Sequence, residues 1–181
     1  MLGPILEGKR VRLEPPRIEH LPEFVRWFAD PEVTRYLFRR YPPSLKQEGE
    51  WLERMAASEE DIVWAVVLKE SGELMGVIGL HRIDWRFRHA WIEISLGDRS
   101  RWGKGYGTEA MSLSTSHAFL DLGFEKVLAS VYSGNDGSLR MLERVGYQQC
   151  GLLRRNSYFA GEWHDERLWE ILREEWKESS T

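Results

Sequence analysis

The sequence predicts an α+β fold, because segments with the alternation of strands and segments with the spacing of helices both occur along its 181 residues. The clearest unit is the segment 91–123, in which an alternating apolar stretch is followed by a glycine-rich loop and a helical pattern. A second unit consists of two apolar runs, 62–68 and 74–83, joined by a short polar segment as in a β-hairpin. With 42% apolar residues, the chain can bury a proper core, and we expect a single domain over residues 1–181.

The segments before the hairpin also follow recognisable patterns. Residues 5–14 alternate like a first strand, and a pair of prolines stops them. Residues 18–28 carry apolar side chains three and four positions apart, which predicts an amphipathic helix. Ser44 and Gln47 have the spacing of a capping box and predict the start of a second helix.

The segments after the central helix predict two further strands, over 126–132 and 147–155, with a short helix over 135–144 between them that ends at Gly146. The last segment, 163–176, is ambiguous. Its apolar residues are spaced three and four apart, which favours a helix.

Composition narrows the possible partners and environment. The net charge of −4 gives no general attraction to nucleic acid or to an anionic membrane, so we expect neither as a partner. A single cysteine, Cys150, excludes an internal disulfide and fits a reducing compartment. Residues 1–20 lack the apolar stretch of a signal peptide, and no apolar run is long enough to span a bilayer. We therefore expect a cytoplasmic protein.

The loop over 98–108 has the composition of an anion-binding site. Gly103, Gly105 and Gly107 lie where the central helix begins, and the first N–H groups of a helix have no internal partners. Glycines allow several such groups to converge on one anion, and Arg99, Arg101 and Lys104 add basic charge. We interpret the loop as a pyrophosphate-binding site, against the alternative that the glycines only make a tight turn.

Two common phosphate-binding motifs do not fit this loop. A nucleoside-triphosphate P-loop requires a Lys followed by Ser or Thr, and no such pair is present. The dinucleotide fingerprint requires a third glycine at the position of Thr108.

The segment RWGKGYGTEA instead resembles the acetyl-coenzyme A loop of the GNAT N-acetyltransferases, with the pattern Q/R-x-x-G-x-G/A. Trp102 stands at the first position of that pattern, as in the RimJ/RimL-like branch, which has W-G-x-G there. The segments NDGSLRMLERVGY and GEWHD resemble two further motifs of that branch in the same order. The resemblance implies the GNAT acyltransferase fold, a mixed and mostly antiparallel sheet of about seven strands with helices on both faces. It also implies a final strand over 163–172.

The resemblance further implies acetyl-CoA as the acetyl donor, direct transfer without an acyl-enzyme, and no metal. It implies that main-chain and side-chain groups of this chain bind the donor. It also implies that the oxyanion formed in the reaction lies beside the central strand, where that strand splays from its neighbour. The candidate cofactor-binding residues are Ile94, Ser95, Leu96, Trp102, Gly103, Lys104, Gly105, Tyr106, Gly107, Thr108 and Asn135.

Ser138 and Glu93 are the candidate catalytic residues. The hydroxyl of Ser138 lies in the N-x-x-S motif and is the candidate proton donor to the leaving thiolate, since the Tyr that many members carry four residues later is Leu142 here. Alternatively, Ser138 is a capping or first-turn serine of the helix. Asn135 is likewise either the cap of this helix or a ligand of the cofactor, and both roles are compatible. Glu93 is the candidate base or amine anchor, against a solvated strand residue. Single histidines, at 81, 117 and 164, are weaker candidates for carrying a proton.

The acceptor is expected to be a primary amine. An amine of pKa about 10.4 costs roughly 4–5 kcal/mol to deprotonate at pH 7, whereas an α-amino group of pKa about 8 costs about 1 kcal/mol. With no certain base, an α-amino group of a peptide or protein N-terminus is favoured. The alternatives are a small-molecule amine (a polyamine, amino sugar or aminoglycoside), or a non-catalytic acyl-CoA sensor. A homodimer is a further expectation from the resemblance.

Overall fold

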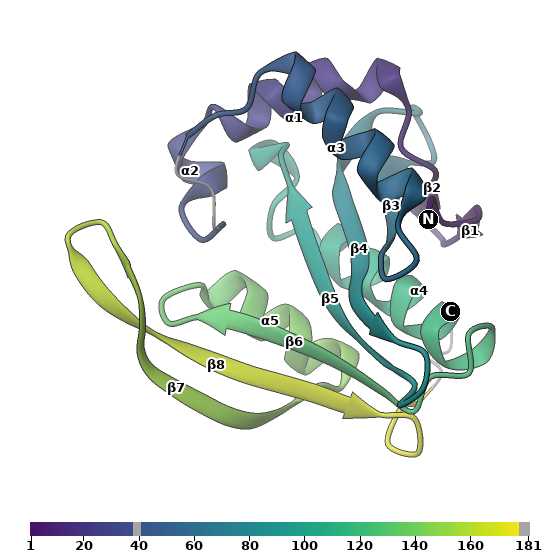
Figure 1. Cartoon of the computed structure of the whole chain (residues 1–181), viewed down its shortest axis with the longest axis vertical. Coiled ribbons are helices and arrows are strands. Elements are labelled where there is room, and N and C mark those ends of the chain that lie inside the picture. The colour runs from purple at the N-terminus through teal and green to yellow at the C-terminus, as the bar shows by residue number, and fades with distance from the viewer. Residues whose placement is uncertain (38–40, 178–181) are drawn as a thin grey trace.

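The computed structural model describes residues 1–37 and 41–177. In this part of the chain, eight strands form one sheet in the order β1-β2-β3-β4-β5-β6-β8-β7 (Figure 1). Every neighbouring pair is antiparallel except β5 and β6, which run parallel. The strands are β1 (Leu6–Glu7), β2 (Val11–Glu14), β3 (Ile62–Leu68), β4 (Leu74–Asp84), β5 (His89–Leu96), β6 (Lys126–Tyr132), β7 (Gln148–Phe159) and β8 (Glu162–Leu172).

The mixed, mostly antiparallel sheet confirms the expected α+β architecture, but the expected number of about seven strands was too low. The difference comes from residues 5–14, which form two short strands instead of one. Between them the chain turns back on itself, with the Gly8 N–H donating to the Val11 carbonyl over 2.9 Å. β1 then pairs antiparallel with β2, so that Leu6 lies opposite Leu13.

The helices cover both faces of the sheet. On one face lie α1 (Leu21–Phe28), α2 (Pro31–Thr34) and α3 (Leu45–Ala57), whose buried side chains pack together and against Leu74 and Val77 of β4. On the other face α4 (Tyr106–Leu120) and α5 (Asp136–Val145) share a larger core with the inner strands (Figure 1). Short 3₁₀ turns, Ile18–His20 and Arg99–Arg101, precede α1 and α4. β4 therefore sends alternate side chains into two separate cores.

The predicted caps are present. Ser44 and Gln47 exchange hydrogen bonds as a capping box at the start of α3. Asn135 caps α5, which begins at Asp136, and Gly146 ends that helix in a left-handed conformation with φ +105°.

β5 and β6 separate from each other part-way along their length. Their parallel pairing runs only from His89 opposite Lys126 to Trp91 opposite Leu128. Beyond that point the two strands diverge, and a wedge opens between them (Figure 1). The splay of the central strand that the resemblance implied is therefore present, and one edge of β5 beyond Trp91 has no strand partner in the described chain.

The C-terminal segment is strand β8, as the resemblance implied, and the helix favoured by its spacing is wrong. β8 lies between β6 and β7, with Trp169 and Ile171 buried on one face. Leu168 and Leu172, which gave the helical spacing, belong to the alternate positions of the same strand. Because this strand carries apolar residues on both faces, its pattern imitates a helix.

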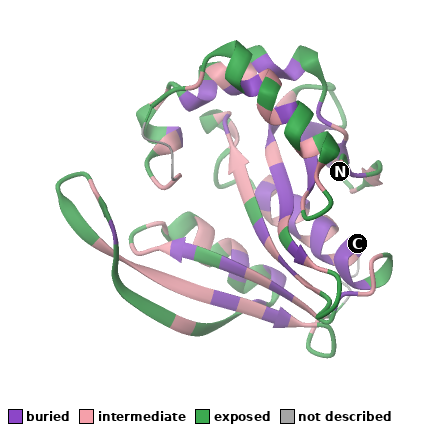
Figure 2. Cartoon of the chain, in the orientation of Figure 1, coloured by how far each residue is buried: buried purple, intermediate pink, exposed green. Residues whose placement is uncertain are grey.

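Buried residues are concentrated in the centre of the sheet and under α4, whereas β7 is largely exposed and β8 is mostly half-buried (Figure 2). All seven residues of β3 are buried, as expected for a strand covered by helices on both faces. None of the helices in residues 1–37 and 41–177 combines the length and apolarity needed to cross a bilayer.

Candidate active site

The glycine loop and the first turn of α4 form an array of free main-chain donors. Gly105 caps the helix in a left-handed conformation with φ +85°, and Gly103 has φ +73°. The first helical bond runs from the Glu109 N–H to the Gly105 carbonyl at 3.1 Å, and no acceptor for the N–H groups of residues 105–108 exists within the described chain. These N–H groups, at the positive end of a 15-residue helix, form an anion-binding arrangement.

The basic residues of the loop are less available than the sequence suggested. Arg101 forms ion pairs with Glu73 at 2.8 Å and with Asp98 at 3.3 Å, and Arg99 pairs with Asp30 at 3.4 Å. These pairs hold the loop against the 71–73 turn and the start of α2. Lys104 is exposed, and its carbonyl accepts a hydrogen bond from the Arg10 guanidinium over 2.9 Å. The positive charge of the site therefore comes mainly from the helix and from residues outside the loop.

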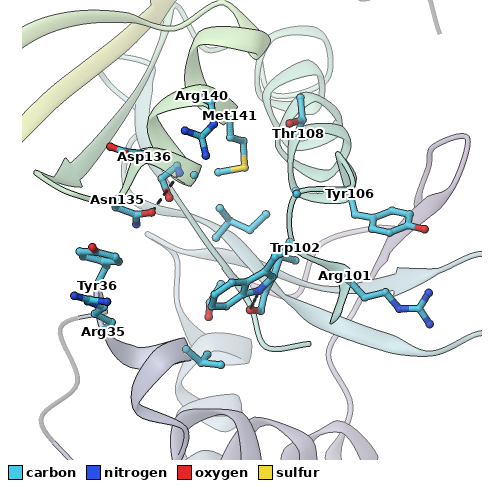
Figure 3. A pocket seen from close by; sticks show the side chains of 18 of the residues that line it. Arg35, Tyr36, Arg101, Trp102, Tyr106, Thr108, Asn135, Asp136, Arg140 and Met141 are labelled. Carbon is cyan, nitrogen blue, oxygen red and sulfur yellow. Dashed lines mark hydrogen bonds between the residues drawn. The ribbon is translucent and has the colours of Figure 1, made fainter. Parts of the chain in front are cut away.

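A cavity of about 610 Å³ lies between this loop, β5, α2 and α5 (Figure 3). Of the sequence-predicted cofactor residues, all except Lys104 line it, including Asn135 and Thr108. Tyr106 contributes to the wall, but its ring points away from the cavity and lies beneath the Arg10 guanidinium, 4.8 Å from the ring centre. Ser138 also lines this cavity, whereas Glu93 does not.

The unpaired edge of β5 faces this cavity. The Gly97 N–H donates to the Met75 carbonyl over 2.9 Å, so that residue faces β4. Main-chain groups alternate in direction along an antiparallel strand, and those of Ile94 and Leu96 consequently point into the wedge between β5 and β6. In agreement, the Leu96 carbonyl accepts the indole N–H of Trp102 over 2.9 Å. The Ile94 amide and carbonyl are thus available for pairing with an extended ligand.

A second cavity, of about 280 Å³, lies on the other face of β5, under α1 and α3. Its walls include aromatic side chains of both helices, among them Phe24, Phe28 and Trp51. Glu93 and His81 line it from the sheet, and Glu48 lines it from α3. Ile94, Ser95 and Leu37 line both cavities, so the two spaces meet at the main chain of β5.

The two cavities are joined, one with an anion-binding helix start and the other with acidic and aromatic walls. This arrangement suits the transfer of a group from a phosphate-bearing donor to an amine.

Comparison with known proteins identifies the family. The model of the acetyltransferase (GNAT) domain matches residues 10–148. The chain belongs to the GNAT acetyltransferase family. It is an acetyltransferase enzyme, and members of the family use acetyl-CoA and act on amine acceptors.

Individual relatives agree with this assignment. The uncharacterised N-acetyltransferase YoaA of Bacillus subtilis is 29% identical over 173 residues, which cover 94% of this chain and 97% of YoaA. The structure of spermidine N-acetyltransferase from Vibrio cholerae in complex with CoA and spermine superposes with a TM-score of 0.85 at 18% identity, covering 93% of this chain and 98% of that one. Mycobacterium smegmatis RimJ in complex with CoA-disulfide gives 0.82 at 23% identity, covering 96% and 87%. At these identities the two structures show the GNAT fold alone.

The residues of this GNAT chain fit an acyl-CoA in three respects. A side chain at Gly107 would fill the site, since a Cβ there would lie 3.0 Å from the Met141 sulfur and 3.2 Å from Leu96 Cδ1. The free N–H groups of residues 105–108 suit a diphosphate, and the open edge of β5 suits a chain that carries amides. Glycine is needed here for close approach, which is the role that the motif assigns to it.

Ser138 stands in the first turn of α5, where its N–H donates to the Asn135 side chain over 3.3 Å. Asn135 is therefore the helix cap, and it also lines the cavity. Leu142, at the position where many GNAT enzymes carry Tyr, is 1% exposed and belongs to the core. Ser138 therefore brings a hydroxyl of α5 to the cavity, whereas the side chain at position 142 has no group that could donate.

Several lining residues were not predicted from the sequence. Arg35 and Tyr36, which follow α2, line the first cavity, and the Tyr36 hydroxyl donates to the Gly134 carbonyl over 2.9 Å. Arg140 and Arg144 of α5 also line it and supply positive charge (Figure 3 labels Arg140). The four-residue spacing of these arginines, on the helix that Asn135 caps, was the available signal. Arg35 and Tyr36 carried none, because only the fold brings α2 to α5.

Proposed function

We propose that this N-acetyltransferase transfers the acetyl group of acetyl-CoA directly to the α-amino group of a peptide or protein N-terminus, as an enzyme of the RimJ/RimL-like branch. The observation that carries the proposal is the junction of the two cavities at Ile94 and Ser95. A donor in the first cavity and an amine in the second would meet at this stretch of β5.

The first cavity supplies the donor site. The N–H groups of residues 105–108 would hold the diphosphate, with Gly103 and Thr108 beside it and Asn135 near the amide-bearing arm. The open edge of β5, at Ile94, Ser95 and Leu96, would pair with that arm. The Ile94 N–H is aimed to stabilise the negative charge that develops on the acetyl oxygen.

Ser138 and Glu93 act from opposite sides of this junction. The Ser138 hydroxyl donates a proton, or a hydrogen bond, to the departing sulfur from the first cavity. Glu93, on the second cavity, holds the ammonium form of the acceptor by charge. After the ammonium has lost one proton to solvent, its nitrogen forms the bond to the thioester carbon. The bond from carbon to sulfur breaks, and the second nitrogen proton ends on the departing thiol.

Three considerations favour an α-amine. Trp102 stands where the general GNAT pattern has Gln or Arg, as in the W-G-x-G motif of the RimJ/RimL-like branch, and its indole holds the Leu96 carbonyl at the donor site. The fold is shared with Mycobacterium smegmatis RimJ. An α-amino group also gives up its proton at pH 7 for about 1 kcal/mol, several kcal/mol less than a lysine-type amine.

A polyamine is the second candidate, and one observation favours it. The second cavity contains two carboxylates, those of Glu48 and Glu93, among aromatic walls, and this combination suits a ligand with several positive charges. The shared fold with a spermidine N-acetyltransferase is consistent with this alternative.

Thiol release from acetyl-CoA tests the proposal directly. The full chain would be assayed against hexapeptides with free α-amines, the same hexapeptides with blocked α-amines and an internal lysine, spermidine, and an aminoglycoside. We expect the highest kcat/KM with free α-amines. Preference for spermidine would replace the acceptor assignment, and turnover with no amine in the panel would contradict the proposal.

A further inference from the structure

His81 and Asp61 form a hydrogen-bonded pair that has no role in the proposed function. The His81 Nδ1 lies 2.8 Å from Asp61 Oδ1, and Asp61 Oδ2 accepts the Ser58 hydroxyl over 2.7 Å. Asp61 directly precedes β3, and His81 lies on β4, so pairing of these strands brings the two side chains together. Burial opposes ionisation of Asp61, but the hydrogen bonds from Ser58 and His81 outweigh it and lower the pKa of Asp61.

This partner fixes the tautomer of the imidazole. An ionised Asp61 accepts only, so Nδ1 carries the hydrogen and Nε2 of the neutral ring keeps its lone pair. The side chain of His81 is 21% exposed, and His81 lines the second cavity. The pair therefore presents a proton-accepting nitrogen from a partly buried wall.

The free nitrogen lies over Gly79, on the face of the sheet that carries the Glu93 side chain. A Cβ added to Gly79 would lie 2.4 Å from His81 Nε2, so the ring folds over this glycine. Gly79 is the β4 residue paired with Glu93 of β5, and paired residues of antiparallel strands have side chains on the same face. Nε2 thus occupies the space of the missing side chain at Gly79, the residue paired with Glu93, and both side chains line the same cavity.

We infer that His81, oriented by Asp61, is the base that takes a proton from the acceptor ammonium, while Glu93 anchors that ammonium. The inference rests on the proposed function and deepens it. Of the two protons that the ammonium loses, one passes to His81 Nε2 before attack and then to solvent. The other ends on the thiol, as the bond from carbon to nitrogen forms and the bond from carbon to sulfur breaks.

Chemistry favours the imidazole over the carboxylate for this step. An imidazole nitrogen is a stronger base than a carboxylate, so it takes a proton from an amine at a smaller free-energy cost. Among the residues that the structure describes, Glu93 and Glu48 line the cavity together with His81. Asp61 binds the ring, and its main-chain carbonyl accepts the Met1 ammonium over 2.6 Å.

The test compares full-length variants with a hexapeptide α-amine and with an arylamine, which is neutral at pH 7. We expect His81→Gln to lower kcat/KM for the hexapeptide about 100-fold or more and to abolish the acid limb of its pH profile. Activity toward the arylamine falls less than about threefold, because that acceptor needs no proton removed before attack. Asp61→Asn is expected to lower kcat/KM for the hexapeptide roughly tenfold, because a carboxylate no longer accepts the Nδ1 hydrogen.

The chain provides matched controls. His117 and Asp121 form a similar pair at 2.6 Å on α4, outside both cavities, and Asp121→Asn should leave the rates unchanged. Gly79→Ala displaces the imidazole without removing it, so it should lower kcat/KM for the hexapeptide as His81→Gln does. Gly49→Ala places its methyl group in open space and should leave this kcat/KM unchanged.

Three results would overturn the inference: full hexapeptide activity in His81→Gln, an equal loss with both acceptors, or an acid limb that disappears in Glu93→Gln and persists in His81→Gln. Each of these leaves the wild-type acetyl transfer intact and is thereby distinguishable from failure of the proposed function, in which the wild type acetylates no amine.

Discussion

Glu109, in the first turn of α4, accepts hydrogen bonds from Arg10 at two points: the main-chain N–H at 2.7 Å and the guanidinium at 3.0 Å. It also accepts the Val11 N–H at 3.1 Å. The same guanidinium donates to the Lys104 carbonyl. One carboxylate therefore ties the start of β2 to the helix and, through Arg10, to the loop that binds the donor in the proposed function.

Removing this charge should destabilise the protein in a pH-dependent way. Burial opposes ionisation of Glu109, but the bonds from Arg10 and Val11 outweigh it and lower the pKa of Glu109 below its reference value of 4.5. A lowered carboxyl pKa contributes stability that is complete above the unfolded pKa and is lost as the pH falls through the folded pKa. Glu109→Gln should therefore lower the free energy of unfolding by about 1 kcal/mol at pH 7, since Arg10 is half exposed.

Urea denaturation between pH 3 and pH 7 measures this effect. The difference between wild type and Glu109→Gln should shrink as the pH falls below about 4. Glu143→Gln, at an exposed position on α5, serves as the control and should give no pH-dependent difference. A constant difference over the whole range would contradict the prediction.

The left-handed glycine at the start of α4 should affect donor binding as well as stability. Gly105 has φ +85°, and an alanine there costs about 1 kcal/mol in strain and would also approach Arg10 Nη2 at 3.1 Å. Gly123, just after the same helix, has φ +68° and open space around it. Both alanine variants should lose similar stability in thermal denaturation, but only Gly105→Ala should raise the KM for acetyl-CoA. An equal effect on KM would show that the loop binds no diphosphate.

Ser138→Ala should lower kcat by roughly 10- to 100-fold without changing the KM for acetyl-CoA, because the proposed hydrogen bond to sulfur forms as the thiolate leaves. Its N–H bond to Asn135 survives in the variant, so the melting temperature should change little. Ser116→Ala, on α4 and outside both cavities, is the control. Unchanged turnover in Ser138→Ala would remove the assignment.

His20 should make the protein less stable in mild acid. The ring is buried, and its Nδ1 accepts the Arg17 N–H over 3.2 Å. Burial and the neighbouring Arg17 lower the pKa of His20, against a smaller opposing effect of Glu14 and Glu19. Below pH 6.5 the unfolded chain consequently binds a proton before the folded one, and stability falls by up to about 1.4 kcal/mol per pH unit.

The free energy of unfolding, measured between pH 7.5 and pH 5, should therefore decline more steeply for the wild type than for His20→Gln. Equal slopes for the two proteins would show that the buried ring is not responsible.

Local patterns in the chain were sufficient for most of the fold. The alternating runs that form β3 to β6, the capping box of α3, and Gly146 at the end of α5 are encoded within a few residues of each other. Local patterns did not predict the correct element where a strand carries apolar residues on both faces or where a short segment folds back on itself. β8 packs apolar residues on both faces and imitates a helix, and residues 5–14 fold back into two strands around Gly8.

The candidate site likewise has a part that local sequence predicts and a part that only the fold brings together. The candidate phosphate-binding loop could be predicted because its chemistry lies in contiguous residues, from Trp102 to Thr108, whose glycines and helix start lie together at the cavity. The sequence alone thus determined the family and the candidate donor-binding loop. Only the tertiary structure decided the acceptor side, where strand pairing lays His81 over Gly79 opposite Glu93 and brings Asp61 to its other nitrogen. The physical reason is that residues far apart in sequence become neighbours through sheet register, which no local pattern records.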